Sequence, residues 1–151
     1  MNKAIYFDMD GTLADLYNVP DWLRKLRAED ASPYAVAAPM VDMVALAEIC
    51  KRLQAEGYTI GVISWLARFS SRRYNAAVRK AKREWLNQFF PIELDELHFV
   101  KYGAPKHLIA KVRQSWLVDD NKEVLTSWQK YGGSGIEAQG NILEALTKLL
   151  S

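Results

Sequence analysis

The chain has 151 residues, and its 20 basic and 18 acidic side chains leave a formal net charge of +2. This length fits a single domain, 1–151, and the near-balance of charge gives no general argument for binding nucleic acid or membranes. Cys50 is the only cysteine, which excludes an internal disulfide and favours a reducing compartment. No apolar run approaches the roughly 18 residues of a membrane span. With no signal peptide recognised either, we expect a cytoplasmic protein.

The first predicted strand, residues 4–7, ends in two carboxylates. Its branched and aromatic residues are typical of a buried central strand. Asp8 and Asp10 follow directly, and a turn opening at Gly11 would let both point toward one place. Two acids this close repel each other unless a divalent cation lies between them. An exposed acidic turn is the alternative, but the apolar strand before the pair favours a functional site.

Residues 7–13, Phe-Asp-Met-Asp-Gly-Thr-Leu, resemble the first motif of the haloacid-dehalogenase (HAD) superfamily, whose members are mostly Mg-dependent phosphatases that work through an aspartyl-phosphate. The longer run through Asp15 is similar to the start of the deoxyribonucleotidase branch. The resemblance implies that Asp8 is the nucleophile, that Asp10 is the general acid/base, and that Thr12 orients this turn beside the substrate. It also implies an α/β, three-layer, Rossmann-like fold: a central parallel sheet with helices on both faces and a small helical cap insertion.

Residues 14–40 interrupt the alternation of strands and helices. Residues 22–26 carry apolar side chains at helical spacing with Asp21 as the expected N-cap, and Ser32–Tyr34 and Pro39 then break the chain. In the resembled superfamily an insertion here forms a cap over the active site. At about 25 residues it is too short for its own core, so we expect a small helical flap. An ordinary helix and loop is the alternative. Its aromatic residues could contact a bound base or simply pack: Tyr17, Trp22 and Tyr34.

A helix and a second buried strand lead to Ser64. The apolar stripe of 41–55 predicts the helix, and residues 59–63 read as the strand. Helix followed by strand is typical of a crossover in a parallel sheet, which puts Ser64 at the edge where the acidic pair lies. In the superfamily's second motif a Ser or Thr donates a hydrogen bond to a phosphoryl oxygen, and the resemblance assigns Ser64 to that role. Trp65, a bulky residue at the next position, is a candidate substrate contact.

Seven basic residues and no acidic one lie between positions 68 and 83. Such a run is usually a solvated helix face. Because it follows the Ser64 strand, it could instead form an electropositive rim that attracts polyanions. Arg68 and Arg72, with Arg73 beside them, are therefore candidate substrate contacts. Residues 82–90 also look like the helix that follows the second motif in deoxyribonucleotidases.

The third predicted strand, residues 97–100, is followed by two lysines that compete for one role. The superfamily's third motif is a lysine near the next helix start, where it neutralises charge on the nucleophile and the phosphoryl group. The resemblance favours Lys106, because an apolar helix start follows it, and Lys101 at the strand tip is the alternative. His98 and His107 fit structural or solvent-facing roles better than catalysis.

The fourth predicted strand, residues 116–118, ends in Asp119 and Asp120. Two apolar strands from distant parts of the chain thus each deliver a pair of acids to the edge where open parallel sheets bind ligands. Four carboxylates cannot converge there without a cation, and hard oxygen ligands select Mg²⁺. The superfamily's fourth motif has this Asp-Asp form. It implies that Asp119 binds the metal directly and that Asp120 acts through a bridging water or through the metal's ligands, with Asp8 and the Asp10 carbonyl completing the site.

These residues together predict a Mg-dependent phosphomonoester hydrolase that acts through an aspartyl-phosphate, on a nucleotide or a related small phosphate ester. The flap at 14–40 is shorter than the deoxyribonucleotidase cap, so an open site could also admit the 3′-phosphate end of a nucleic acid, which the basic run would suit. A catalytically silent binding or regulatory module on the same scaffold is a third hypothesis, and the full set of acids argues against it. The sequence predicts no oligomeric state.

Overall fold

The computed structural model describes residues 3–151 and contains a five-stranded sheet in the order β3-β2-β1-β4-β5. Every neighbouring pair of strands is parallel. The strands are β1 (Ala4–Phe7), β2 (Thr59–Trp65), β3 (Glu96–Val100), β4 (Ser115–Asp119) and β5 (Ser134–Glu137). All four residues of β1 are buried, as expected for the central strand of a sheet that is covered on both faces.

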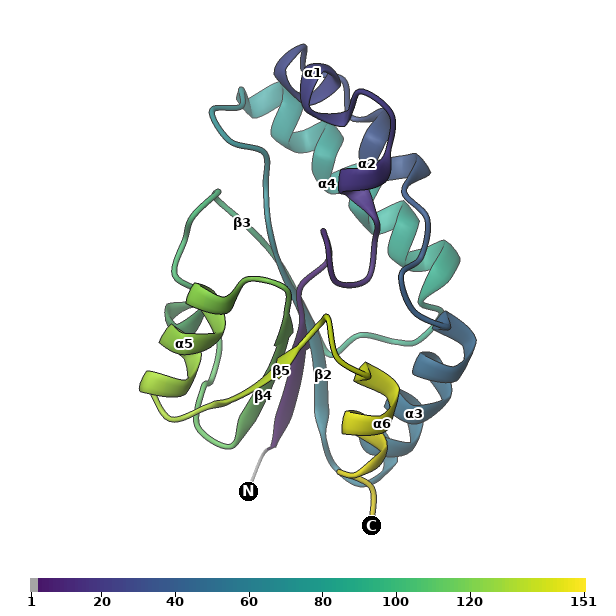
Figure 1. The fold of residues 1–151 in the computed structure, drawn as a ribbon, viewed down its shortest axis with the longest axis vertical. Helices are drawn as coiled ribbons and strands as arrows, with labels where there is room; N and C mark the ends of the chain where they lie inside the picture. Colours follow the sequence, from purple (N-terminus) through teal and green to yellow (C-terminus); the bar gives the residue numbers. More distant parts are fainter. Residues whose placement is uncertain (1–2) are drawn as a thin grey trace.

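Helices cover both faces of the sheet (Figure 1), which confirms the predicted three-layer α/β fold. The covering helices are α3 (Met43–Ala55), α5 (Lys122–Lys130) and α6 (Ile142–Thr147). Alternate side chains of β1 supply the two cores. Ile5 and Phe7 belong to the larger core, which α3 and α6 cover. Tyr6 points the other way and packs edge-on against Trp128 of α5, with 5.8 Å between the ring centroids.

The segment 14–40, called the flap below, follows β1. It contains a 3₁₀ turn (Leu16–Asn18) and two short helices, α1 (Trp22–Arg27) and α2 (Ser32–Val36). They lie beside the long helix α4 (Arg72–Phe89), at the top of the molecule in Figure 1. The flap is closed at its base, because the Asp15 N–H donates to the Ala38 carbonyl at 2.8 Å and the Met40 N–H to the Leu13 carbonyl at 2.8 Å.

The flap shares an apolar core with α4 instead of having one of its own. Leu16 and Tyr34 of the flap are buried together with Tyr74 and Val78 of α4. The Tyr74 hydroxyl also donates to the Asp30 carbonyl at 2.9 Å. This packing explains how so short an insertion is ordered.

Three local predictions were wrong. Ser32–Tyr34 does not break the chain but begins α2, because Pro33 is compatible with the first turn of a helix. Asp21 has a left-handed backbone (φ 58°) and its side chain does not cap α1. Lys106 begins only a short 3₁₀ helix, Lys106–Leu108, and the expected apolar helix does not continue through Ile109 and Ala110. Among residues 3–151 no helix combines the length and apolar character that crossing a membrane requires.

Candidate active site

The register of the sheet brings Asp8 and Asp119 to the same edge. Phe7 pairs with Val118 of β4, so the two acids that follow are neighbours. The Asp8 N–H donates to the Val118 carbonyl at 2.9 Å, which fixes the point at which the chain leaves β1. The prediction that acids from distant parts of the chain meet at the carboxyl edge is thereby confirmed.

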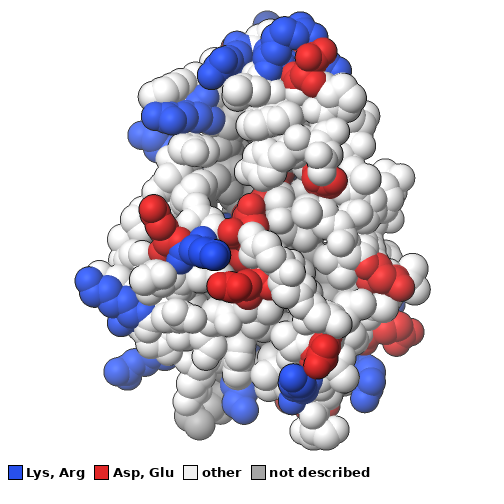
Figure 2. Space-filling view, in the orientation of Figure 1, with Lys and Arg blue, Asp and Glu red and all other residues white. Residues whose placement is uncertain are grey.

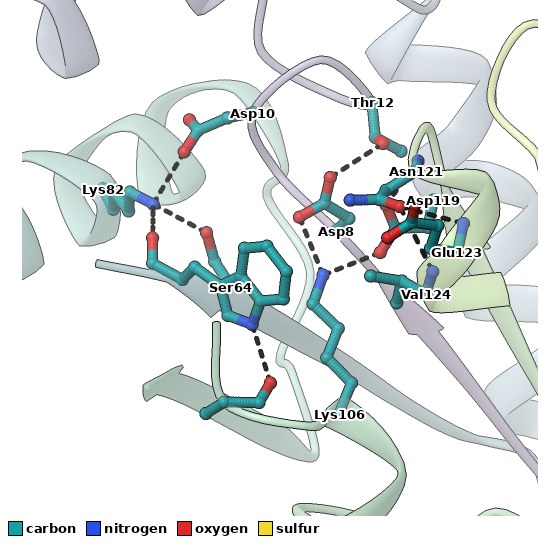
Figure 3. A network of polar contacts seen from close by, with 12 residues as sticks. Asp8, Asp10, Thr12, Ser64, Lys82, Lys106, Asp119, Asn121, Glu123 and Val124 are labelled. Carbon is teal, nitrogen blue, oxygen red and sulfur yellow. Dashed lines mark hydrogen bonds and ion pairs between the residues drawn. The ribbon is translucent and has the colours of Figure 1, made fainter. Parts of the chain in front are cut away.

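Three carboxylates form a cluster with the dimensions of a cation site. One oxygen each of Asp8, Asp119 and Asp120 lies within 4.8 Å of the other two. Asp8 and Asp119 are buried, with 8% and 1% of their surface exposed, and Asp120 is half-buried. Convergent hard oxygen donors of this kind fit a divalent cation such as Mg²⁺, which would keep several waters as well. The Asp10 carboxylate points to Lys82, away from this cluster (Figure 3).

Gly11 lets the turn after Asp10 pass close to this cluster. Its φ of 81° lies in the left-handed region that favours glycine. A Cβ at this position would collide with the Asp120 carboxylate, and it would lie 2.9 Å from the Tyr17 ring. The glycine is therefore required both by the backbone conformation and by the space that Asp120 occupies.

Burial and the closeness of the acids raise the pKa of two of them. Burial, followed by the charge of Asp8, raises the pKa of Asp119. The same two causes, in the same order, raise the pKa of Asp120 to about 8. In the absence of a cation the cluster therefore holds a proton at neutral pH, and a bound cation would displace it.

Lys106 links two of the clustered acids. Its Nζ donates to Asp8 Oδ1 at 2.9 Å and to Asp119 Oδ2 at 2.7 Å. Burial alone would lower the pKa of Lys106, but the charges of Asp8 and Asp119 outweigh burial and raise it, so the ammonium form is favoured. Lys101 is exposed and Lys106 is 3% exposed, so of the two predicted candidates the structure brings Lys106 to the acids.

A second buried lysine, Lys82, was missed as a site residue because the sequence places it in the basic run. It is fully buried on α4, and its ammonium group makes three hydrogen bonds (Figure 3). The acceptors are Asp10 Oδ2 at 2.9 Å, Ser64 Oγ at 2.7 Å and the Trp65 carbonyl at 2.7 Å. The Tyr34 ring of the flap lies 4.9 Å from the same nitrogen.

The two lysines nearly complete the charge balance of the site. When all groups are ionised, four carboxylates and two ammonium groups leave a net charge of −2, which one divalent cation would neutralise. The sequence did hold a signal for Lys82. It falls four residues after Val78 and three before Trp85, on the buried face of α4.

The hydroxyl groups of Thr12 and Ser64, both predicted site residues, are buried and hydrogen-bonded to charged groups of the site. Thr12, which is 1% exposed, donates to Asp8 Oδ2 at 3.1 Å and so supports the carboxylate. Ser64 is fully buried and accepts from Lys82, and it is not part of the cavity wall. Trp65 does line the cavity, and its indole N–H donates to the Ala104 carbonyl at 2.9 Å.

A cavity of about 1020 Å³ opens above the acids. The flap forms one wall, with Tyr17, Trp22 and Tyr34, and the loop between β2 and α4 forms another. Arg68 lies on this second wall. Arg72 is exposed on the first turn of α4 and does not line the cavity, so the structure separates two arginines that the sequence grouped.

No family model and no curated protein matches the sequence. Solved structures, in contrast, match over most of its length. The D,D-heptose 1,7-bisphosphate phosphatase from B. bronchiseptica, complexed with magnesium and phosphate, is 13% identical over 97% of this chain and 99% of its own, with a TM-score of 0.61. A HAD family enzyme from Bacteroides thetaiotaomicron, in complex with magnesium and inorganic phosphate, is 9% identical over 96% and 99%, with a TM-score of 0.55.

The L-2-haloacid dehalogenase from Xanthobacter autotrophicus, with chloropropionic acid covalently bound, is 13% identical over 91% of this chain and 77% of its own, with a TM-score of 0.51. The chain has the haloacid-dehalogenase fold. In this fold Asp8 directly follows the central strand, and the cluster of three acids lies at the carboxyl edge of the sheet.

Proposed function

We propose that the protein is a Mg-dependent phosphomonoester hydrolase in which Asp8 forms an aspartyl-phosphate. The observation that carries the proposal is the position of the Asp8 carboxylate, between the Lys106 ammonium and two further acids at the base of a cavity. Mg²⁺ bound by Asp8, Asp119 and Asp120 would offset the repulsion between these acids and an incoming phosphate. A dianionic substrate needs such a cation, whereas a carbon–halogen bond does not, so the acid cluster favours phosphate chemistry over dehalogenation.

The reaction divides into two displacements at phosphorus. In the first, an Asp8 oxygen forms a bond to phosphorus, the ester P–O bond breaks, and Asp10 gives its proton to the leaving alkoxide. In the second, Asp10 takes a proton from water as the water oxygen attacks phosphorus, which releases inorganic phosphate and restores Asp8. Lys106 stabilises the negative charge of the Asp8 carboxylate before the first displacement and again after the second has restored it.

We infer that Lys82 is the positioning residue for Asp10. Three hydrogen bonds fix the Lys82 ammonium group, and one of them holds the Asp10 carboxylate away from the acid cluster. Asp10 is thereby kept apart from the oxygens that would bind the cation. Its carboxylate stays available for proton transfer to the leaving group.

We propose a nucleotide as the small substrate. The cavity volume of about 1020 Å³ far exceeds what a phosphate group needs. Its walls carry aromatic side chains from both sides, among them Tyr17 and Trp22 on the flap and Trp65 and Tyr102 opposite. Aromatic faces can stack on a base whatever its identity. A catalytically silent module is disfavoured, because it would have no need to keep two buried lysines among four acids.

A phosphatase screen tests this proposal. The purified protein is offered nucleoside monophosphates, sugar phosphates and p-nitrophenyl phosphate, with Mg²⁺ and with EDTA, beside Asp8→Asn. We expect hydrolysis that requires Mg²⁺, and loss of more than about a thousandfold in Asp8→Asn, with the fold of the variant checked by circular dichroism. Hydrolysis that persists in EDTA, or in Asp8→Asn, would overturn the assignment.

A further inference from the structure

The side chain of Phe69, in the loop between β2 and α4, is exposed to solvent. Phe69 is 92% exposed and has a φ of 53°, a left-handed backbone that is unfavourable for a bulky residue. The loop is nevertheless anchored, since the Leu66 N–H donates to the Val100 carbonyl at 2.7 Å and the Ser70 hydroxyl to the Ala67 carbonyl at 2.8 Å. Such exposure and backbone strain in an anchored loop make Phe69 a candidate for contact with a ligand.

Phe69 is the outer end of a row of aromatic rings and cations that leads into the cavity. The Arg68 guanidinium lies 4.8 Å from the Phe69 ring centroid and 5.8 Å from that of Tyr102. Tyr102 contacts Trp65, with 5.2 Å between centroids. The Trp65 ring lies 5.5 Å from the Lys106 ammonium at the candidate catalytic centre. We call these residues the aromatic row: Phe69, Arg68, Tyr102 and Trp65.

Positive charge surrounds the outer end of this row. Arg72 and Arg73 are exposed on the first turn of α4, and Arg27 of α1 lines the opposite wall of the cavity. Figure 2 shows Lys and Arg side chains gathered over the upper part of the molecule, where α1 and the start of α4 lie in Figure 1, above the acidic group near the middle. Glu29 also lines the cavity, but its carboxylate accepts hydrogen bonds from Ser71.

We propose that the aromatic row together with Arg27, Arg72 and Arg73, called the rim below, binds a single-stranded nucleic acid. The proposed nucleotide substrate is then the phosphorylated end of a strand, and its terminal phosphate lies at the acids. Bases can stack on the exposed rings while Arg68, Arg72 and Arg73 contact the phosphates between them. Phe69 lines the outer part of the cavity, whereas Arg72 and Arg73 lie outside its lining, so a mononucleotide held at the acids would leave these two arginines without a partner. The inference rests on the proposed phosphatase function for the terminal phosphate, but the strand-binding rim can be tested separately.

Binding is measured with Asp8→Asn and fluorescent oligothymidylates of one to six nucleotides that carry a terminal phosphate at either end. We expect the affinity to rise about tenfold for each base that stacks on the row, until the row is filled. In Arg72→Ala/Arg73→Ala the slope of log affinity against log salt should fall by about 1.4, the amount expected for two single-strand phosphate contacts. Affinity that does not change with length would overturn the proposal.

The matched variants are Phe69→Ser and Val44→Ser, two exposed apolar residues, the second being 77% exposed on α3. The matched charge control for the arginine pair is Lys51→Ala/Arg52→Ala, which is also exposed on α3. We expect Phe69→Ser to lower tetranucleotide affinity about tenfold and Val44→Ser to have no effect. Equal effects of a rim variant and its control would contradict the proposal.

Turnover separates the two proposals. In the wild-type protein kcat/KM should be higher for the phosphorylated tetranucleotide than for p-nitrophenyl phosphate. Phe69→Ser should lower the ratio of these two values. Length-dependent binding without hydrolysis of any phosphate ester would support the rim and contradict the phosphatase. Hydrolysis of mononucleotides with no preference for longer strands would support the phosphatase and contradict the rim.

Discussion

Two lysines of this chain are buried among carboxylates, and each has a different set of partners. Lys106 contacts Asp8 and Asp119, whereas Lys82 contacts Asp10 and Ser64. Burying an ammonium group is costly unless it is paired and hydrogen-bonded, and each lysine is paired with a different acid, Lys106 with Asp8 and Lys82 with Asp10. The proposed nucleophile Asp8 and the proposed acid/base Asp10 therefore each have an ammonium partner of their own.

Replacing Lys82 tests its positioning role. Lys82→Met should lower kcat/KM about a hundredfold for an alkyl phosphate, whose leaving group needs a proton from Asp10. The loss should be much smaller for p-nitrophenyl phosphate, whose leaving group does not. The measurement is kcat/KM for both substrates, with exposed Lys80→Met on the same helix as the control. An equal loss for both substrates would point to a purely structural role.

Gly11 and Gly57 provide a matched pair of substitutions. Both have positive φ, 81° and 97°, but a Cβ at Gly57 meets nothing within 4 Å, whereas at Gly11 it meets Asp120. Both Ala variants should therefore lose stability through backbone strain, by about 1 kcal/mol or more. Only Gly11→Ala should also weaken Mg²⁺ binding, measured by calorimetry. Unchanged Mg²⁺ affinity in Gly11→Ala would show that Asp120 does not contribute to the cation site.

At the scale of elements, an apolar core and a hydrogen-bonded carboxylate both hold the flap against α4. Apolar side chains of both segments form one small core, and the Glu29 carboxylate accepts from the backbone N–H and the hydroxyl of Ser71. Ser71 is itself the N-cap of α4, because its hydroxyl accepts from the Tyr74 N–H at 3.1 Å. The contact between Glu29 and Ser71 therefore holds both the flap wall of the cavity and the first turn of α4.

Removing this contact should loosen the cavity wall. Glu29→Ala is expected to increase hydrogen exchange in residues 66–71 and to raise KM more than it changes kcat, because the chemistry lies below the flap. Exposed Glu48→Ala on α3 is the control. The Ser71 backbone N–H and then its hydroxyl lower the pKa of Glu29, so the contact persists at neutral pH and weakens as the pH falls below the ordinary glutamate range. Exchange that stays at the wild-type level would refute this role.

The sequence predicted the elements better than their junctions. Apolar runs that end in polar residues marked β1, β2 and β4 correctly, because burial in a parallel sheet demands such runs. Within the basic run of α4, Lys82 faces inward while the basic residues beside it, Lys80 and Arg83, are exposed, so charge alone does not mark it. Its spacing from Val78 and Trp85 on the buried face was the available signal. The choice between Lys101 and Lys106 also had to wait for the structure, since it depends on how the loop after β3 folds back over the sheet.

At the scale of the whole molecule, folding concentrates acids that repel one another at one edge of the sheet. In the cation-free protein burial and the charge of Asp8 raise the pKa of Asp120 to about 8, far above that of an aspartate in an unfolded chain. Between these two values the folded state binds more protons than the unfolded state. The Asp120 carboxyl group therefore contributes stability that is present near pH 4 and is lost as the pH rises to about 8.

A thermal titration tests this linkage. Without a cation, the melting temperature of the wild type should decrease between pH 5.5 and pH 8, and this decrease should be smaller in Asp120→Asn. Mg²⁺ should raise the melting temperature more at pH 8 than at pH 5.5, because at the lower pH it must displace a proton from the cluster. A stabilisation by Mg²⁺ that is independent of pH would contradict the coupling.

The most direct measurement of the proposed mechanism is the intact mass of Asp10→Asn after mixing with p-nitrophenyl phosphate and Mg²⁺. This variant keeps the nucleophile but loses the base that activates water, so the phosphoryl-enzyme should accumulate. We predict a gain of one phosphoryl group per chain, mapped by peptide analysis to Asp8 and absent without Mg²⁺. A phosphoryl group on another residue, or turnover in Asp10→Asn that leaves no adduct at any time, would contradict the account.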